Sequence, residues 1–164
     1  SPKNRLRGPL SQKQAIEQAA RIFREVGDAC AEAGSCLVIE ANPEAYGADF
    51  CTSLEQAAEL VEAAGSPGFG LHVDAGGMAL SGESFESVLR QAAGLLRHVH
   101  ASQPNLISFA NPDPVHARIA KILHETGYSG SELDRHWTHA GISQKIASGP
   151  RVCDQGHCCQ PNGH

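Results

Sequence analysis

"CLVIEANPEAYGADF", the stretch from residue 36 to residue 50, sets a short apolar run directly before an acid and a turn. Residues 36–39 have the character of a buried strand, and Asn42 and Pro43 then favour a turn. Glu40 stands between the two. Its carboxylate is either the point where the strand reaches water or a group held at the strand end for chemistry.

Helices and short strands alternate along the chain outward from this stretch. Apolar residues at helical spacing predict helices over residues 11–33, 52–65, 83–96 and 116–125. Apolar runs predict strands over residues 36–40, 69–74 and 98–102. The alternation is typical of βαβ units and predicts an α/β fold with a parallel sheet. Doubly wound sheets and closed barrels both produce such a pattern, so periodicity leaves these two open.

Each predicted strand carries a potential metal or proton-transfer ligand at its end: Glu40, Asp74 and His100. In parallel α/β proteins the active site assembles at the carboxyl ends of the strands. The two-residue period of a strand also predicts that His72 shares a face with Asp74, and His98 with His100. Three ligand types at three successive strand ends therefore favour a functional site.

Each of these residues also has a purely structural interpretation. Glu40 could be a solvated strand end, and Asp74 could be a turn-forming residue before Gly76 and Gly77. A single histidine such as His100 is more often packed or exposed than a ligand. The Gly76-Gly77 pair lacks the G-x-G-x-x-G spacing, so a dinucleotide-binding fingerprint is rejected.

Four segments arrive in an order and at a spacing that resemble one known family. They are "LVIEANPEAYGADF", "PGFGLHVDAGGMALSGE", "RHVHASQP" and "LHETGYSG". Together they resemble the sugar phosphate isomerase/epimerase family, the xylose isomerase-like TIM barrels, and the opening "SPKNR" resembles the segment after that family's fourth strand. The resemblance implies that residues 1–130 form the C-terminal half of a (β/α)8 barrel.

The same resemblance implies a divalent metal at the mouth of the barrel, held by Glu, Asp, His and a second Glu from strands five to eight. By motif match, Glu40, Asp74 and His100 are the first three ligands. Carboxylate oxygens with one imidazole suit Mn²⁺, Mg²⁺ or Co²⁺. The implied activity is isomerisation or epimerisation of a sugar or sugar phosphate in carbohydrate metabolism, through an enediolate that the metal stabilises. Glu40 then serves as both ligand and acid/base catalyst.

The sequence departs from the family pattern at three places. Gly77 stands where many members have a substrate-contacting His, and Gln103 stands where an acid is common. The fourth ligand is not evident, because no apolar strand follows residue 130. Glu132 and Asp134 are the nearest candidates for it.

Residues 131–164 form an atypical tail in which hydrophobic periodicity fades. We interpret this tail as disordered, or as translated from a shifted reading frame. The tail contains potential zinc ligands: Cys153, His157, Cys158, Cys159 and His164. Its cysteines do not form a C-x-x-C motif, which argues against a structural zinc site.

Composition limits the partners of the protein. The chain has 164 residues and a net charge of −5, which predicts no nucleic-acid partner. No apolar stretch approaches the roughly 20 residues of a membrane span, so no membrane partner is expected. Cys30, Cys36 and Cys51 stand singly, which favours a reducing, cytoplasmic location. A half barrel has two open sheet edges, which predicts either a homo-oligomer in which another chain completes the barrel or a fragment of a longer barrel.

Three functions remain after these considerations. The first is a divalent-metal-dependent sugar isomerase/epimerase acting on a small-molecule sugar. The second is a non-catalytic remnant or binding module that keeps the fold but lacks the fourth ligand. The third is a metal-dependent endonuclease acting at abasic sites, as in a related barrel family, although the acidic charge disfavours it.

Overall fold

A 21-residue helix, α1 (Gln12–Glu32), precedes the sheet in the computed structural model, which describes residues 5–81, 84–107, 110–111 and 113–129. The helix begins at Ser11 with a capping box. The Ser11 hydroxyl accepts a hydrogen bond from the Gln14 backbone N–H at 3.3 Å, and the Gln14 side chain accepts one from the Ser11 N–H at 3.0 Å. The predicted helix over residues 11–33 is therefore confirmed to within one residue at each end.

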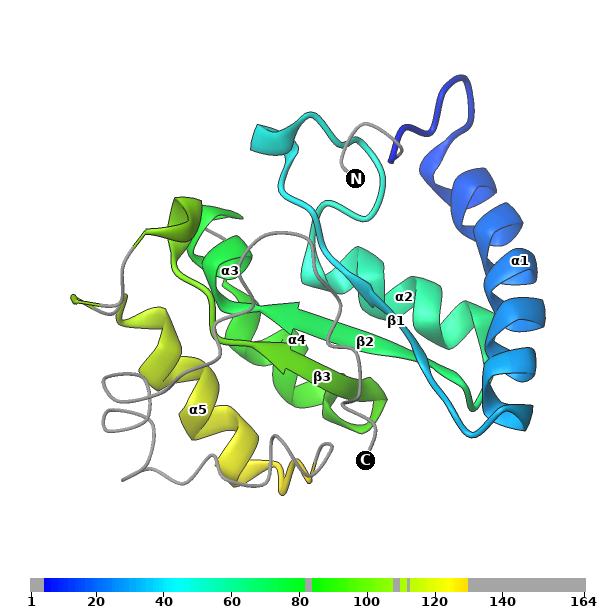
Figure 1. Cartoon of the computed structure of the whole chain (residues 1–164). Coiled ribbons are helices and arrows are strands. Elements are labelled where there is room, and N and C mark those ends of the chain that lie inside the picture. Colours follow the sequence, from blue (N-terminus) through cyan, green and yellow to red (C-terminus); the bar gives the residue numbers. More distant parts are fainter. Residues whose placement is uncertain (1–4, 82–83, 108–109, 112, 130–164) are drawn as a thin grey trace, which may run out of the picture.

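Three parallel strands in the order β1-β2-β3 form the sheet: β1 (Leu37–Glu40), β2 (Phe69–Asp74) and β3 (Leu96–His100). Helix α2 (Leu54–Ala64) connects β1 to β2 (Figure 1). The α/β fold of parallel βα units is confirmed. Residues 131–164, including Glu132 and Asp134, lie outside the described residues.

The connection from β2 to β3 differs from the predicted single helix over residues 83–96. Helix α3 (Ala75–Ser81) follows β2 directly, and α4 (Phe85–Gln91) ends before a 3₁₀ turn, η3 (Ala93–Leu95). Gly94 has a low helix propensity, and Leu96 already begins β3. The paired glycines of α3 made that helix difficult to predict from sequence.

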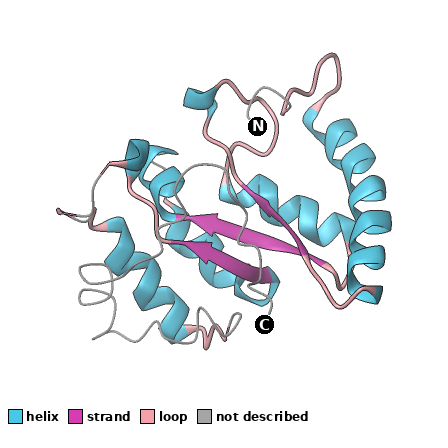
Figure 2. Ribbon diagram, in the orientation of Figure 1, coloured by secondary structure: helices cyan, strands magenta, loops and turns pink. Residues whose placement is uncertain are grey.

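The remaining described elements are two 3₁₀ turns and one helix (Figure 2). Two 3₁₀ turns follow strands, η2 (Glu44–Tyr46) after β1 and η4 (Pro104–Leu106) after β3. Helix α5 (Val115–Glu125) matches the helix predicted over residues 116–125. None of the described helices combines the length and apolar character that crossing a membrane requires.

The two faces of the sheet have opposite character. On one face, buried apolar side chains such as Ile39, Leu71 and Val73 pack into the core formed with the helices. Figure 1 shows α2 and α4 behind the sheet, on one side of it. Alternation along β2 places His72 and Asp74 on the opposite face. In a closed barrel that second face lines the interior.

A β-bulge at Arg97 keeps the two faces of β3 in step with those of β2. Leu71 pairs with Leu96, whereas His72 pairs with His98, so Arg97 is one extra residue in β3. Leu96 therefore stays in the core, while His98 pairs with His72 on the other face. Without the bulge, two-residue alternation would place Leu96 and His98 on the same face.

Gly70 provides the space that this bulge needs. A Cβ atom at position 70 would lie 2.2 Å from the Cγ atom of Arg97 and 3.1 Å from its Cβ atom. The first distance is a steric overlap with the stem of the Arg97 side chain, which would have to move. The bulge at Arg97 therefore requires a residue without a side chain at position 70 of the adjacent strand.

We expect Gly70→Ala to destabilise the fold by about 1–3 kcal/mol, the usual cost of overpacking. The double variant Gly70→Ala/Arg97→Ala removes the Cγ atom and should recover most of that loss. Urea unfolding followed by circular dichroism measures both values. Gly94→Ala is the control, because nothing lies within 4 Å of a Cβ atom there. Equal stability of the single and double variants would contradict the pairing.

Candidate metal centre

The structure brings Glu40, Asp74 and His100 together at the carboxyl ends of β1, β2 and β3. One ligand atom from each residue lies within 4.8 Å of the other two. Two atoms that are each about 2.1 Å from one metal ion stand at most about 4.2 Å apart. Three donors around one ion stand closer still, at about 3.0–3.6 Å from one another, so side-chain adjustments of about 1–2 Å bring the three ligands to one ion.

Asp74 uses one carboxylate oxygen for structure and leaves the other for the cluster. Its Oδ1 accepts hydrogen bonds from the Gly77 backbone N–H at 2.7 Å and from the Ser102 hydroxyl at 2.6 Å. Its Oδ2 lies 3.9 Å from His100 Nδ1. The bond from Gly77 caps the start of α3, so the structural interpretation of Asp74 holds for one oxygen.

Ser102 is a site residue that sequence reasoning missed. Besides donating to Asp74, its hydroxyl oxygen accepts a hydrogen bond from the Gly76 N–H at 3.0 Å. The backbone carbonyl of Ser102 in turn lies 2.8 Å from Nε2 of the buried His116 on α5. The available sequence signal was its position two residues after His100, on the loop leaving β3.

Glu40 is not a fully solvated strand end, because 35% of its side chain is exposed. Its Oε2 lies 3.2 Å from His72 Nδ1, and its backbone carbonyl accepts a hydrogen bond from Arg5. Burial raises the pKa of Glu40, and the neighbouring Asp74 charge raises it further, against the opposing effects of Arg5 and an Asn42 hydrogen bond. A carboxyl group so placed exchanges protons closer to neutral pH than an exposed one.

Three histidine rings lie beside the carboxylates on the same face of the sheet. The His72 ring centroid lies 4.2 Å from that of His100 and 5.1 Å from that of His98. Burial, reinforced by the neighbouring His100 and His98, lowers the pKa of His72 to about 3. His72 is therefore neutral at physiological pH, with a proton on Nδ1 that it donates to Glu40. The predicted sharing of one face by these histidines and Asp74 is confirmed.

Gln103 stands where an acid is common in the family pattern, and its side chain has a structural role here. The side chain is 3% exposed, donates to the Asn111 carbonyl at 2.9 Å and accepts from the Asp113 N–H at 3.1 Å. Both halves of the amide thus hold the loop between β3 and α5. Gln103 therefore fixes the loop that carries Ser102.

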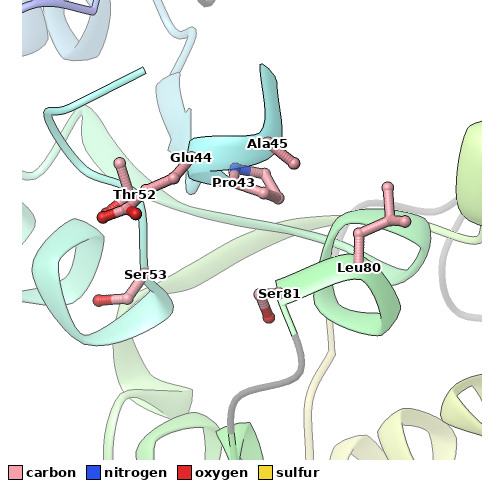
Figure 3. A pocket seen from close by; sticks show the side chains of 7 residues that line it. All are labelled: Pro43, Glu44, Ala45, Thr52, Ser53, Leu80 and Ser81. Atoms are coloured by element: carbon pink, nitrogen blue, oxygen red, sulfur yellow. The ribbon is translucent and has the colours of Figure 1, made fainter. Parts of the chain in front are cut away.

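A shallow pocket lies near the strand ends but not on the ligand cluster (Figure 3). It is formed by η2, the start of α2 and the end of α3, and its lining residues are Pro43, Glu44, Ala45, Thr52, Ser53, Leu80 and Ser81. Glu40, Asp74 and His100 are not among them. The chemistry of the donor atoms identifies the cluster as the candidate site, since the pocket holds one carboxylate and no histidine.

Comparison with known proteins identifies the family. Residues 2–140 match the family model described as the xylose isomerase-like TIM barrel, and the chain belongs to this family. The resemblance noted in the sequence is thereby confirmed. No curated protein matches the chain significantly.

Several solved structures share the fold at low sequence identity. A D-psicose 3-epimerase crystallised with D-fructose has 18% identity and a TM-score of 0.66, over 76% of this chain and 43% of that one. A 3-keto-D-glucoside 4-epimerase from E. coli has 16% identity and a TM-score of 0.64, over 75% and 46%. An L-ribulose 3-epimerase has 20% identity and a TM-score of 0.59, over 87% and 49%. This chain spans less than half the length of each.

We expect Ser102→Ala to weaken binding of Mn²⁺ by about tenfold, as loss of a residue that orients a ligand typically does. The reason is that Asp74 Oδ1 would keep one of its two donors and the carboxylate could rotate. Isothermal titration of the full chain measures the affinity. Ser87→Ala on the exposed face of α4 is the control. Unchanged Mn²⁺ affinity in Ser102→Ala would show that this hydroxyl does not position the carboxylate.

A second prediction concerns His72 in the metal-free protein. Its folded pKa lies far below the unfolded value near 6.5, so the unfolded state alone binds a proton between these values. The stability contributed by neutral His72 is complete above about pH 6.5 and is lost as pH falls toward 3, at up to about 1.4 kcal/mol per pH unit. The unfolding free energy should therefore fall more steeply from pH 7 to pH 5 in wild type than in His72→Gln. Urea titrations with a chelator present measure this, and parallel pH profiles would contradict it.

Proposed function

We propose that the protein takes part in the isomerisation or epimerisation of a sugar or sugar phosphate, with a divalent metal held by Glu40, Asp74 and His100. The convergence of these three side chains at adjacent strand ends is the observation that carries the proposal. Family membership and the sugar epimerases among its structural neighbours support it.

The donor set fits a hard divalent ion. Two carboxylates and one imidazole are ligands that Mn²⁺, Mg²⁺ or Co²⁺ accept, and Ser102 fixes one carboxylate in place. When bound, such an ion polarises the sugar carbonyl and stabilises negative charge on its oxygen. The substrate class is inferred from this chemistry together with the fold.

Glu40 is the residue that we assign to proton transfer. Reaction next to a carbonyl requires a base that removes the α-proton, leaving an enediolate, and an acid that returns a proton. The raised pKa of Glu40, caused by burial and by the Asp74 charge, suits a carboxylate that alternates between both forms. His72 Nδ1 lies 3.2 Å from Glu40 Oε2, and a hydrogen bond from Nδ1–H would orient the carboxylate for this role.

Completion of the site requires further strands. In the described part of the chain, β1 and β3 each pair along one edge, so the sheet has two open edges. A second copy of the chain that pairs with these edges would form a homo-oligomer and enclose the sugar. The fourth metal ligand would then come from this second copy or from Glu132 or Asp134.

A cytoplasmic location and a small-molecule partner complete the proposal. Cys30, Cys36 and Cys51 are free thiols, as is usual in a reducing compartment. The net charge of −5 supports a neutral or metal-bridged substrate over a nucleic acid. The endonuclease alternative gains no support from the described site.

Binding of Mn²⁺ and exchange of the substrate proton test the proposal. Saturating Mn²⁺, at about 100 times the dissociation constant, should stabilise the wild type by about 2.7 kcal/mol, and Glu40→Gln should largely abolish the resulting rise in melting temperature. Glu62→Gln on the exposed face of α2 is the control that keeps the rise. Light scattering in the same buffer measures the oligomeric state.

The activity measurement uses deuterium. With D-fructose in heavy water, wild type with Mn²⁺ should incorporate deuterium at the carbon beside the carbonyl, and Glu40→Gln should not. Mn²⁺ binding without exchange would support the non-catalytic alternative. An equal Mn²⁺ shift in wild type and Glu40→Gln would exclude Glu40 as a ligand.

A further inference from the structure

A second donor set lies beside the carboxylates and consists of imidazoles alone. One ring nitrogen each from His72, His98 and His100 lies within 4.8 Å of the other two. The rings of His98 and His100 have centroids 4.7 Å apart and are nearly perpendicular, at 82°. The Arg97 bulge and the β2–β3 register bring these three rings together. His100 belongs to both donor sets.

His72 has a nitrogen that is ready to bind a ligand. The residue is 7% exposed, and its Nε2 has no hydrogen-bond partner among the described residues. Its Nδ1 lies 3.2 Å from Glu40 Oε2, which places the proton on Nδ1 and leaves a lone pair on Nε2. Metal-binding histidines in proteins commonly show this arrangement, in which a carboxylate holds one ring nitrogen and the ion takes the other.

Among the described residues, the cluster reaches solvent at His100. His98 is half-buried, and half of the His100 side chain is exposed. An ion can therefore approach from the side of His100 and reach His72, which is the most buried of the three. Burial of one ligand with exposure of another gives the site both a fixed anchor and an entry path.

We propose that His72, His98 and His100 form a second, all-nitrogen metal site that takes a late divalent transition ion such as Zn²⁺, Ni²⁺ or Cu²⁺. Three imidazoles favour such ions, whereas the carboxylate set favours Mn²⁺ or Mg²⁺. Because His100 is common to both sets, the two sites are mutually exclusive. A late transition ion in the histidine site therefore removes one ligand from the carboxylate site and excludes its metal. This inference stands on the histidines and does not require the proposed function.

Two single substitutions separate the sites. His98→Gln removes a ligand from the histidine set alone, and Asp74→Asn removes one from the carboxylate set alone. Isothermal titration of the full chain should show that His98→Gln binds Zn²⁺ about 100-fold more weakly while Mn²⁺ affinity changes less than about threefold. Asp74→Asn should do the reverse, and His100→Gln should weaken both.

The measurement uses a background without the cysteines of the tail, because thiolates are strong zinc ligands. All variants therefore carry serine at positions 153, 158 and 159, where the sequence has cysteine. His124→Gln, on the exposed side of α5, is the matched control that retains both affinities. Circular dichroism shows that each variant is folded, and His98→Asn replaces His98→Gln if the latter is not.

Binding of Cu²⁺ identifies the coordinating atoms by an independent spectroscopic measurement. Electron paramagnetic resonance of the Cu²⁺ protein should show coupling to imidazole nitrogen in wild type and Asp74→Asn, and reduced coupling in His98→Gln. Equal Zn²⁺ affinity in wild type and His98→Gln would overturn the inference. Failure of Mn²⁺ binding would count against the proposed function alone, provided that Asp74→Asn still binds Zn²⁺.

Discussion

The register between β2 and β3 is the constraint on which the candidate site depends. Leu71 pairs with Leu96 while Val73 pairs with Val99, so β3 accommodates one more residue than β2 over the same length. The extra residue, Arg97, lets Leu96 stay in the core while His98 pairs with His72 on the opposite face. Bulges occur often beside active sites because they re-aim side chains in this way.

The same division of the sheet explains how a polar cluster can be held in place. Apolar side chains on the helix-facing side, such as Leu71 and Val73, are fully buried and supply the hydrophobic stabilisation. The opposite face carries Glu40, His72 and Asp74, whose partial burial is unfavourable unless they contact one another. Packing of the apolar face holds the strands in place, and the strands in turn hold Glu40, His72 and Asp74 close together.

Asp74 combines a structural role with a place in the candidate metal cluster. One oxygen caps α3 and receives the Ser102 hydroxyl, while the other faces His100. The sequence alone presented these roles as alternatives, because Asp before two glycines is typical of a turn. Because its two carboxylate oxygens have different partners, the two interpretations are compatible.

The sequence by itself determined the α/β class, the strands that carry Glu40, Asp74 and His100, and the family, because hydrophobic periodicity and strand-end motifs are local patterns. Tertiary structure alone decided the bulge at Arg97 and the link from Ser102 to Asp74, because each depends on which residues of separate strands and loops become neighbours. No spacing within one segment carries that information. The elements are therefore encoded locally, and the way their side chains meet is encoded only by packing.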